Sequence, residues 1–126
     1  MRNISFFHTQ EQFRNRTKTV TRRLGWKDLK PGTLLCGVVK GRGLKPGEKI
    51  ERLGVIRVVR VYREPLHYIA ATPDRGSAEC AAEGFPDMLG WEFIEMFCKH
   101  MKCEPTTPVT RIEFEYTDLP VAGEGR

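Results

Sequence analysis

The run from Ile50 to Tyr62, rich in β-branched residues and arginine, constrains the fold of this chain more than any other segment. Residues branched at Cβ favour extended structure, so the run predicts a strand, the longest in the chain. Pro65 ends this strand because proline has no N–H group to donate to a sheet ladder. A domain built around such a strand is expected to be rich in β-structure.

Four shorter segments are also predicted to be strands. Ile4–Phe7 and Thr33–Val39 are apolar runs of strand length, and Thr17–Arg23 has a Thr-Val-Thr core that prefers extended structure. Val109–Tyr116 alternates in a way that predicts a strand with one face in water. The basic, glycine-containing residues 40–47 predict a loop.

Three segments are predicted to be helical. Thr9 followed by Gln12 has the form of a capping box, which predicts a helix over Thr9–Arg16. Residues 74–84 predict a short helix or turn that ends at Gly84. From residue 86 onward, apolar side chains recur at helical spacing. They indicate an amphipathic helix whose aromatic and methionine stripe packs in the core.

This order of elements, with Pro-Gly turns between short strands, predicts an α+β domain that is mostly β. The expected shape is a small barrel with short helices at its ends. A chain of 126 residues fits one domain with one hydrophobic core. We place this domain at residues 1–116 and expect residues 117–126 to be a flexible C-terminal tail.

The cysteines, the histidines and the first residues bear on location and metal binding. No apolar run approaches the roughly 20 residues of a membrane helix, and the start lacks the long apolar stretch of a signal peptide. We therefore expect a cytoplasmic protein with no membrane association and reduced thiols. Cysteine and histidine spacing does not match a zinc site, so neither a metal nor another cofactor is expected. These residues are Cys36, Cys80, Cys98, Cys103, His8, His67 and His100.

Charge is distributed unevenly along the chain. The net charge is +5, but residues 1–60 hold 15 lysines and arginines against 4 acidic residues, and the remainder is acidic overall. A segment this basic in a small fold is expected to form a surface that attracts polyanions, which favours a nucleic-acid or nucleotide ligand. The alternatives are a basic face that is merely solvated and an adaptor that binds an acidic protein partner.

Several short segments, taken in their order and spacing, resemble the ASCH domain family from about Ile4 to Tyr116. The segments are Ile4–Phe7, Thr17–Arg22, Leu29–Gly32, Val55–Val61, Glu83–Phe85, the helix through Phe93 and Phe97, and Ile112–Phe114. The resemblance implies a PUA-like barrel associated with RNA binding. It also implies a cleft near the Lys-x-x-Thr segment and the Glu-Gly-Phe segment.

One branch of this family is similar to bacterial amidohydrolases that remove the acetyl group from N4-acetylcytidine. That likeness implies a lysine, a threonine three residues later and a distant glutamate as catalytic residues. Lys18, Thr21 and Glu83 take these positions, and Glu79 lies close enough to compete with Glu83. The chain departs from the branch in its added loop at residues 41–47, its Arg-Arg pair after the threonine and its longer C-terminus. A different ligand in the same cleft is therefore an open alternative.

The main hypothesis is a monomer that binds RNA, a nucleotide or a modified nucleoside in the basic cleft. Lys18, Arg22 and Arg23 would hold anionic groups, Thr21 would hydrogen-bond the ligand, and Glu83 would accept from a base amino or amide N–H. Thr19, Trp26 and Phe85 complete the expected binding set, the two aromatic residues as stacking surfaces.

The alternative is an amidohydrolase with Thr21 as nucleophile, Lys18 as base and Glu83 as supporting carboxylate. Lysine can act as a base only if its pKa falls from about 10.4 towards neutrality. Burial and the neighbouring arginines would lower it. Residues three apart point to opposite faces of a regular strand, so Lys18 must precede the strand, or the backbone must turn, for both side chains to share a cleft.

Overall fold

The strand β4 (Arg52–Pro65), 14 residues long, is the central member of a five-stranded sheet. The computed structural model describes residues 1–121, and within them the sheet order is β1-β3-β4-β5-β2. The other strands are β1 (Arg2–Ser5), β2 (Val20–Arg23), β3 (Leu34–Val38) and β5 (Pro108–Tyr116). The helices are η1 (Phe7–Thr9), α1 (Gln10–Arg14), η2 (Leu66–Ala70), α2 (Pro73–Glu83) and α3 (Gly90–Met101).

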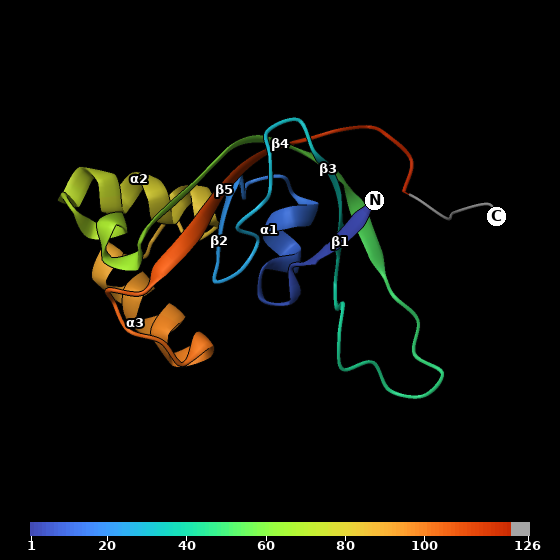
Figure 1. Cartoon of the computed structure of the whole chain (residues 1–126), viewed down its shortest axis with the longest axis horizontal. Helices are drawn as coiled ribbons and strands as arrows, with labels where there is room; N and C mark the ends of the chain where they lie inside the picture. The colour runs from blue at the N-terminus through green and yellow to red at the C-terminus, as the bar shows by residue number, and fades with distance from the viewer. Residues whose placement is uncertain (122–126) are drawn as a thin grey trace.

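The sheet is mixed and strongly curled. β3 and β5 pair antiparallel with β4, β2 pairs antiparallel with β5, and β1 pairs parallel with β3. The register shifts between Gly37 and Val38 and again between Val58 and Arg60. Such bulges increase local twist and bend the strand that carries them. The sheet therefore arches over α1, as a half-barrel rather than a flat layer (Figure 1).

One hydrophobic cluster fills the inside of this arch. Phe13 of α1 packs there against Phe6 and Phe114, with ring centroids 4.7 and 6.4 Å away. A Cβ atom added at Gly37 would lie 2.5 Å from the Phe13 ring, so the ring rests directly on the β3 backbone. α1 is thereby anchored under the sheet.

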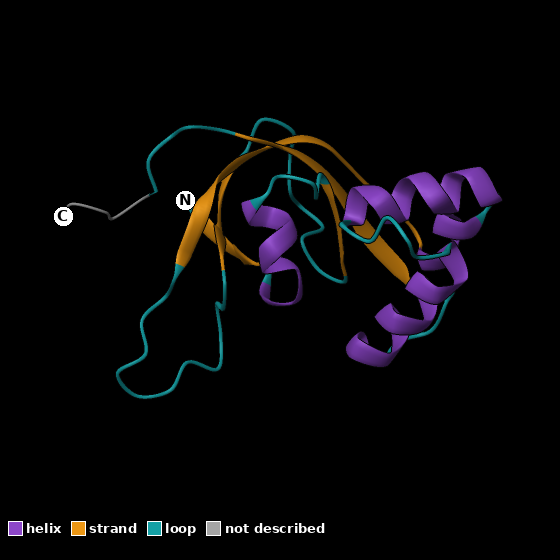
Figure 2. Cartoon of the chain, turned by 180° about the vertical axis from the view of Figure 1, so that it is seen from behind, coloured by secondary structure: helices purple, strands orange, loops and turns teal. Residues whose placement is uncertain are grey.

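A second cluster lies at one end of the sheet, where α2 and α3 pack side by side (Figure 2). Its buried members are Leu66, Ile69, Cys80, Phe93, Phe97 and Val109. The two helices approach closely at their glycines, since a Cβ on Gly76 would lie 3.3 Å from the Cα of Gly90. The mostly β, α+β architecture is thus as the sequence predicts, but the barrel is open and only one of its ends is covered by α2 and α3, since α1 lies under the sheet.

β1 and β2 are the two edges of the sheet, and a side chain joins them. Arg23 Nη2, at the end of β2, donates to the backbone oxygen of Ser5, at the end of β1, at 2.6 Å. In the described residues no backbone ladder connects these two strands. The half-barrel is therefore open between β1 and β2. We call this opening the seam, and the candidate site lies there.

Most predicted elements are confirmed, and three details of the sequence reading are wrong. Phe7 begins a 3-10 helix instead of extending β1, and Thr9 makes no side-chain cap hydrogen bond. β5 lacks a wet face along its first half, because Val109 and Arg111 are both buried. Arg111 is covered by α2, whose Glu79 accepts a hydrogen bond from its Nε at 2.6 Å.

The predicted tail, residues 117–126, falls only partly within the described chain. Thr117 is bonded to the sheet, donating from its backbone N at 3.1 Å and from Oγ1 at 2.8 Å to the oxygen of Val55. Residues 122–126 lie outside the described residues. None of the helices described in residues 1–121 has the length and apolar character needed to span a bilayer.

Candidate functional site

A pocket of about 340 Å³ opens at the seam between β1 and β2, beside α3. Its polar lining includes Ser5, Lys18, Thr21, Arg22, Arg23 and Glu83. Its aromatic and methionine lining includes Phe6, Phe7, Phe85, Phe93, Phe97 and Met96. Aromatic walls around a few convergent polar groups are typical of small-molecule sites.

Backbone hydrogen bonds place Lys18 in this pocket. The amides of Thr17 and Lys18 donate to the oxygen of Gln12 at 3.0 and 3.2 Å, and the amide of Thr19 donates to Ala82 at 2.8 Å. The segment before β2 is therefore tied both to α1 and to the last turn of α2. Lys18 precedes the strand, which meets the geometric condition that the sequence set for Lys18 and Thr21.

Lys18 and Glu83 form a buried ion pair. Lys18 Nζ donates to Glu83 Oε1 at 2.9 Å and to the Glu83 backbone oxygen at 2.7 Å. Both side chains are nearly inaccessible to solvent, at 3% and 4% exposure. Glu83 is the last residue of α2, so the ammonium also lies at the negative end of the helix dipole.

Gly84 ends α2 directly after Glu83, whose side chain is held by Lys18 and Arg22. The Gly84 φ of +103° is left-handed, a conformation that glycine adopts without steric cost. The question left open by the sequence is also answered here: Glu83 lines the pocket, and Glu79 does not. Glu79 lies one helical turn earlier and faces a second layer of arginines.

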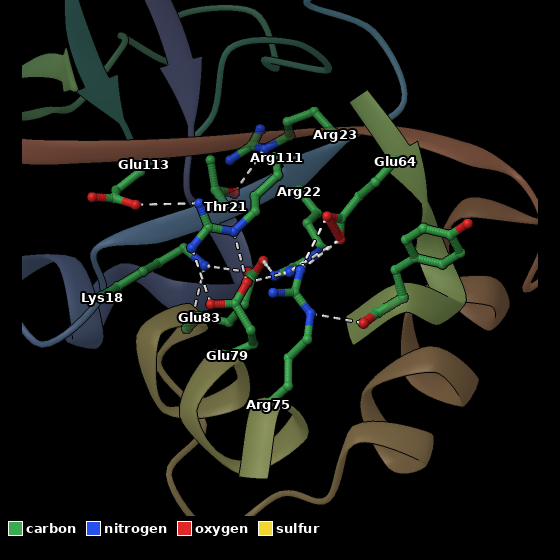
Figure 3. A network of polar contacts seen from close by, with 11 residues as sticks. Lys18, Thr21, Arg22, Arg23, Glu64, Arg75, Glu79, Glu83, Arg111 and Glu113 are labelled. Carbon is green, nitrogen blue, oxygen red and sulfur yellow. Dashed lines mark hydrogen bonds and ion pairs between the residues drawn. The ribbon is translucent and has the colours of Figure 1, made fainter. Parts of the chain in front are cut away.

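That second layer continues the ion pairs away from the pocket (Figure 3). Arg22 Nη1 donates to Glu83 Oε2 at 2.9 Å, and Arg22 Nη2 donates to Glu79. Arg111 donates to both carboxylate oxygens of Glu79, from Nε at 2.6 Å and from Nη2 at 3.0 Å. At the outer end, Arg75 Nη2 contacts both oxygens of Glu64 at 3.0 and 3.1 Å. A chain of ion pairs thus holds the Glu83 carboxylate on its side away from the pocket.

This network occupies the side chain of Arg22, although the residue also lines the pocket. Arg22 was expected to hold ligand anions; its side chain is 0% exposed and pairs with Glu79 and Glu83. The residue alternates with Thr21 and Arg23 across β2, so it points towards α2. Arg22 is a positioning residue for Glu83. Its Nε atom has no hydrogen-bond partner among the described residues.

Burial and charge together shift the pKa values in the network. Burial lowers the pKa of Lys18, and the nearby Arg23 and Arg22 act in the same direction, against the opposing attraction of Glu83. Burial likewise lowers the pKa of Arg23 to about 10, opposed by Glu83. For Glu79 burial would raise the pKa, but hydrogen bonds from Arg111 and Arg22 outweigh it and lower the value to about 2.

Thr21 lines the same pocket and is held by its neighbour on the strand. Its Oγ1 accepts from Arg23 Nε at 3.0 Å, and the residue is 3% exposed. Within residues 1–121 no hydrogen bond joins Lys18 to Thr21. The hydroxyl keeps its own proton for donation to a ligand.

The remaining predicted site residues fall in different places. Phe85 lines the pocket, as expected of a stacking residue. Thr19 is exposed and outside the lining, and Trp26 lines a separate groove that shares Arg23 with the pocket. The three predicted catalytic residues are therefore brought together, whereas of the other expected binding residues Phe85 lines the pocket, Trp26 lines the groove and Thr19 lines neither.

Sequence reasoning missed the contribution of α3 and η1 to the pocket. Phe93 and Phe97 pack in the second cluster, as the helical stripe predicts, but they also form the pocket wall. His8 and His100 line it as well, with ring centroids 4.9 Å apart. These histidines are far apart in the chain, so no local spacing could have indicated their contact.

Metal ligation finds no support in the described part of the chain. No group of three His, Cys, Asp or Glu side chains converges there in a way that could hold an ion. Cys98 and Cys103, with sulfur atoms 4.0 Å apart, are free thiols.

The fold and the site define a small α+β half-barrel with a ligand-sized pocket at its open seam. The chain matches no protein-family model and no curated protein. Its fold is similar to the crystal structure of protein EF3133 from Enterococcus faecalis V583, of the family DUF984, with a TM-score of 0.55. The two share 18% identity over 94% of this chain and 76% of that one. The likeness extends to the fold alone.

Proposed function

We propose that this protein is a binding module of the ASCH type that takes a base of RNA, a nucleotide or a modified nucleoside into the pocket. One observation carries the proposal. Lys18, Thr21 and Glu83, which the family resemblance singles out, line a single aromatic-walled pocket although Lys18 and Glu83 are 65 residues apart. Residues that are scattered in the sequence but converge on one cavity favour a shared ligand.

The chemistry of the pocket suits a nucleobase. A base has apolar faces that stack on aromatic rings and a polar edge that forms hydrogen bonds. Phe85 and Phe93 supply rings with centroids 6.3 Å apart. Thr21 offers a hydroxyl that donates and accepts, and Arg23 offers N–H donors. The carboxylate of Glu83 accepts from Lys18 and Arg22 and retains lone pairs for a base amino group.

Binding is tested by titrating the protein with cytidine, uridine, adenosine, guanosine and N4-acetylcytidine in a calorimeter. We expect one of them to bind. Phe85→Leu should weaken binding about tenfold, since a stacked base contributes roughly 1–3 kcal/mol. Thr21→Val should weaken it by a similar factor, since a lost hydrogen bond costs about 0.5–1.5 kcal/mol. Trp91→Leu is the matched control, because Trp91 is 60% exposed and lines neither the pocket nor the groove. If Trp91→Leu weakened nucleoside binding as much as the pocket variants do, the pocket would not be the binding site.

The second candidate function is hydrolysis of an N-acylated nucleoside in the same pocket. Its supporting observation is the buried ammonium of Lys18, whose pKa is lowered by burial next to the pocket that also holds Thr21. In this reaction the neutral amine form of Lys18, which the lowered pKa makes more accessible, takes the proton of Thr21 Oγ1 as that oxygen attacks the acyl carbon. The resulting ammonium returns the proton to N4 as the C–N bond breaks, which leaves a threonine ester. Water then hydrolyses the threonine ester and releases acetate.

Turnover is tested by incubating the protein with N4-acetylcytidine and following cytidine by chromatography. Thr21→Val should abolish release and Thr21→Ser should restore part of it, because serine keeps the hydroxyl. Binding without release by the wild type would reject hydrolysis of this substrate and leave the binding function in place. Release that survives in Thr21→Val would remove Thr21 as the nucleophile.

A further inference from the structure

A second hollow of about 810 Å³ lies directly beside the pocket. Ser5, Phe7, Arg23 and Met101 line both, so the two hollows are continuous at the seam. In the proposed function the pocket takes a base, and the larger groove leads away from it along β1 and past the end of β2. A ligand that filled the pocket would therefore extend into the groove.

The groove is basic and has no acidic lining. Its cationic residues are Arg2 on β1, Arg23 on β2, and Lys40 and Arg42 in the loop between β3 and β4. Lys40 has a partner in Glu48, 3.6 Å away, but no carboxylate residue is part of the described lining. The planar guanidinium of arginine can donate two parallel hydrogen bonds to one phosphate group. This arrangement of cationic side chains therefore suits a chain of phosphate groups.

Trp26 adds an aromatic surface to the groove. The guanidinium of Arg2 lies over its ring, 4.1 Å from the centroid. Trp26 also has a φ of +62°, an unusual backbone conformation for a bulky residue, with a cost of order 1 kcal/mol. An arginine held over a tryptophan presents a flat cationic plane on which a base can stack.

We infer that the groove binds the sugar-phosphate chain of a single-stranded nucleic acid, one base of which enters the pocket. Arg2, Arg23 and Arg42 contact the phosphates, and the Arg2–Trp26 pair supports the neighbouring base. The strand is single because a base can enter the pocket only when it is unpaired. This inference rests on the proposed function and narrows its ligand, among the RNA base, nucleotide and modified nucleoside named there, to a nucleotide within a single strand.

The inference is tested with a fluorescein-labelled single-stranded octaribonucleotide of random sequence, followed by anisotropy between 50 and 200 mM salt. The double variant Arg2→Gln/Arg42→Gln should weaken binding at least tenfold. It should also reduce the slope of log K against log salt by about 1–2, since each phosphate contact contributes roughly 0.7 for single strands. Arg57→Gln/Arg60→Gln removes the same charge from β4, outside both hollows, and should have little effect.

Three results would overturn the inference. They are no octamer binding at 50 mM salt, equal losses in the two double variants, and equal affinity for a nucleoside 5′-monophosphate and the octamer. The nucleoside titration described above distinguishes a failure of this inference from a failure of the proposed function. If the nucleoside binds but the octamer does not, the proposed function of the pocket stands and the inference about the groove is rejected. If neither binds, both are rejected.

Discussion

Arg23 and Ser5 connect the two edges of the sheet through one hydrogen bond, from Arg23 Nη2 to the Ser5 oxygen at 2.6 Å. The same guanidinium donates from Nε to Thr21 Oγ1 at 3.0 Å. A single side chain therefore spans the seam and orients a pocket hydroxyl. The pocket lies where the backbone ladder does not close, and Arg23 connects the two strands across that opening.

Replacing Arg23 should loosen the seam. We expect Arg23→Met to lower the free energy of unfolding by about 2 kcal/mol, because hydrogen bonds from a charged group contribute roughly 1.5–3 kcal/mol. Arg23→Lys should cost less, since an ammonium can keep one of the two bonds. Urea denaturation measures both, with the exposed Arg52→Met as control. A loss in the control as large as that in Arg23→Met would contradict a specific role for the seam.

Glu79 should make the protein sensitive to acid. Its folded pKa of about 2 lies below the ordinary value of 4.5, so its stabilising contribution is present above pH 4.5 and is lost as pH falls towards 2. The shift corresponds to about 3 kcal/mol at most. Glu79→Gln should therefore destabilise the protein strongly at pH 7, where it leaves Arg22 and Arg111 without this carboxylate.

The test of this prediction is the pH dependence of the difference between variant and wild type. Thermal unfolding at pH 7 and at pH 2.5 should show a large difference at the first pH and a smaller one at the second. Glu51→Gln is the control, because Glu51 forms an exposed ion pair with Arg14. A difference that is constant with pH would mean that the ionised form of Glu79 is not what stabilises the network.

Gly84 should tolerate no side chain. Alanine there would have to adopt a φ near +103°, and its Cβ would lie 2.9 Å from Gln12 Cγ and 3.0 Å from Gln12 Cβ. We expect Gly84→Ala to cost about 1–3 kcal/mol of stability and to displace Glu83 from Lys18. Chemical denaturation measures the loss. Gly25→Ala serves as control, since a Cβ there meets no atom within 4 Å.

Lys18 should titrate below the ordinary lysine value of 10.5, because burial lowers its pKa. The unfolded chain then binds this proton more tightly than the folded one, so the contribution of Lys18 to stability rises with pH through the window that ends at 10.5. Glu83→Gln should lower the Lys18 pKa further by removing the attraction that opposes burial. NMR of the lysine side-chain carbons measures both proteins, and an unchanged or raised midpoint in the variant would contradict this balance of forces.

Much of the secondary structure could be predicted from the residues alone, because neighbours in the chain determine it. The β-branched run that forms β4 and the glycine that ends α2 act through local backbone preference. The family resemblance also indicated Lys18, Thr21 and Glu83, and the geometric condition on Lys18 followed from strand alternation. Periodicity placed Phe93 and Phe97 in a core.

Only the tertiary structure decided what these residues contact. The pairing of Arg22 with Glu79 and Glu83, and that of Arg111 with Glu79, depend on how α2 docks on the curled sheet. Such contacts join residues 32 to 61 positions apart, so no local spacing encodes them. The sequence by itself determined where most strands and helices lie, the glycine end of α2 and the candidate polar residues. The curl of the sheet decided that a seam would open beside them, because bulges and packing set the distance between edges that are never neighbours in the chain.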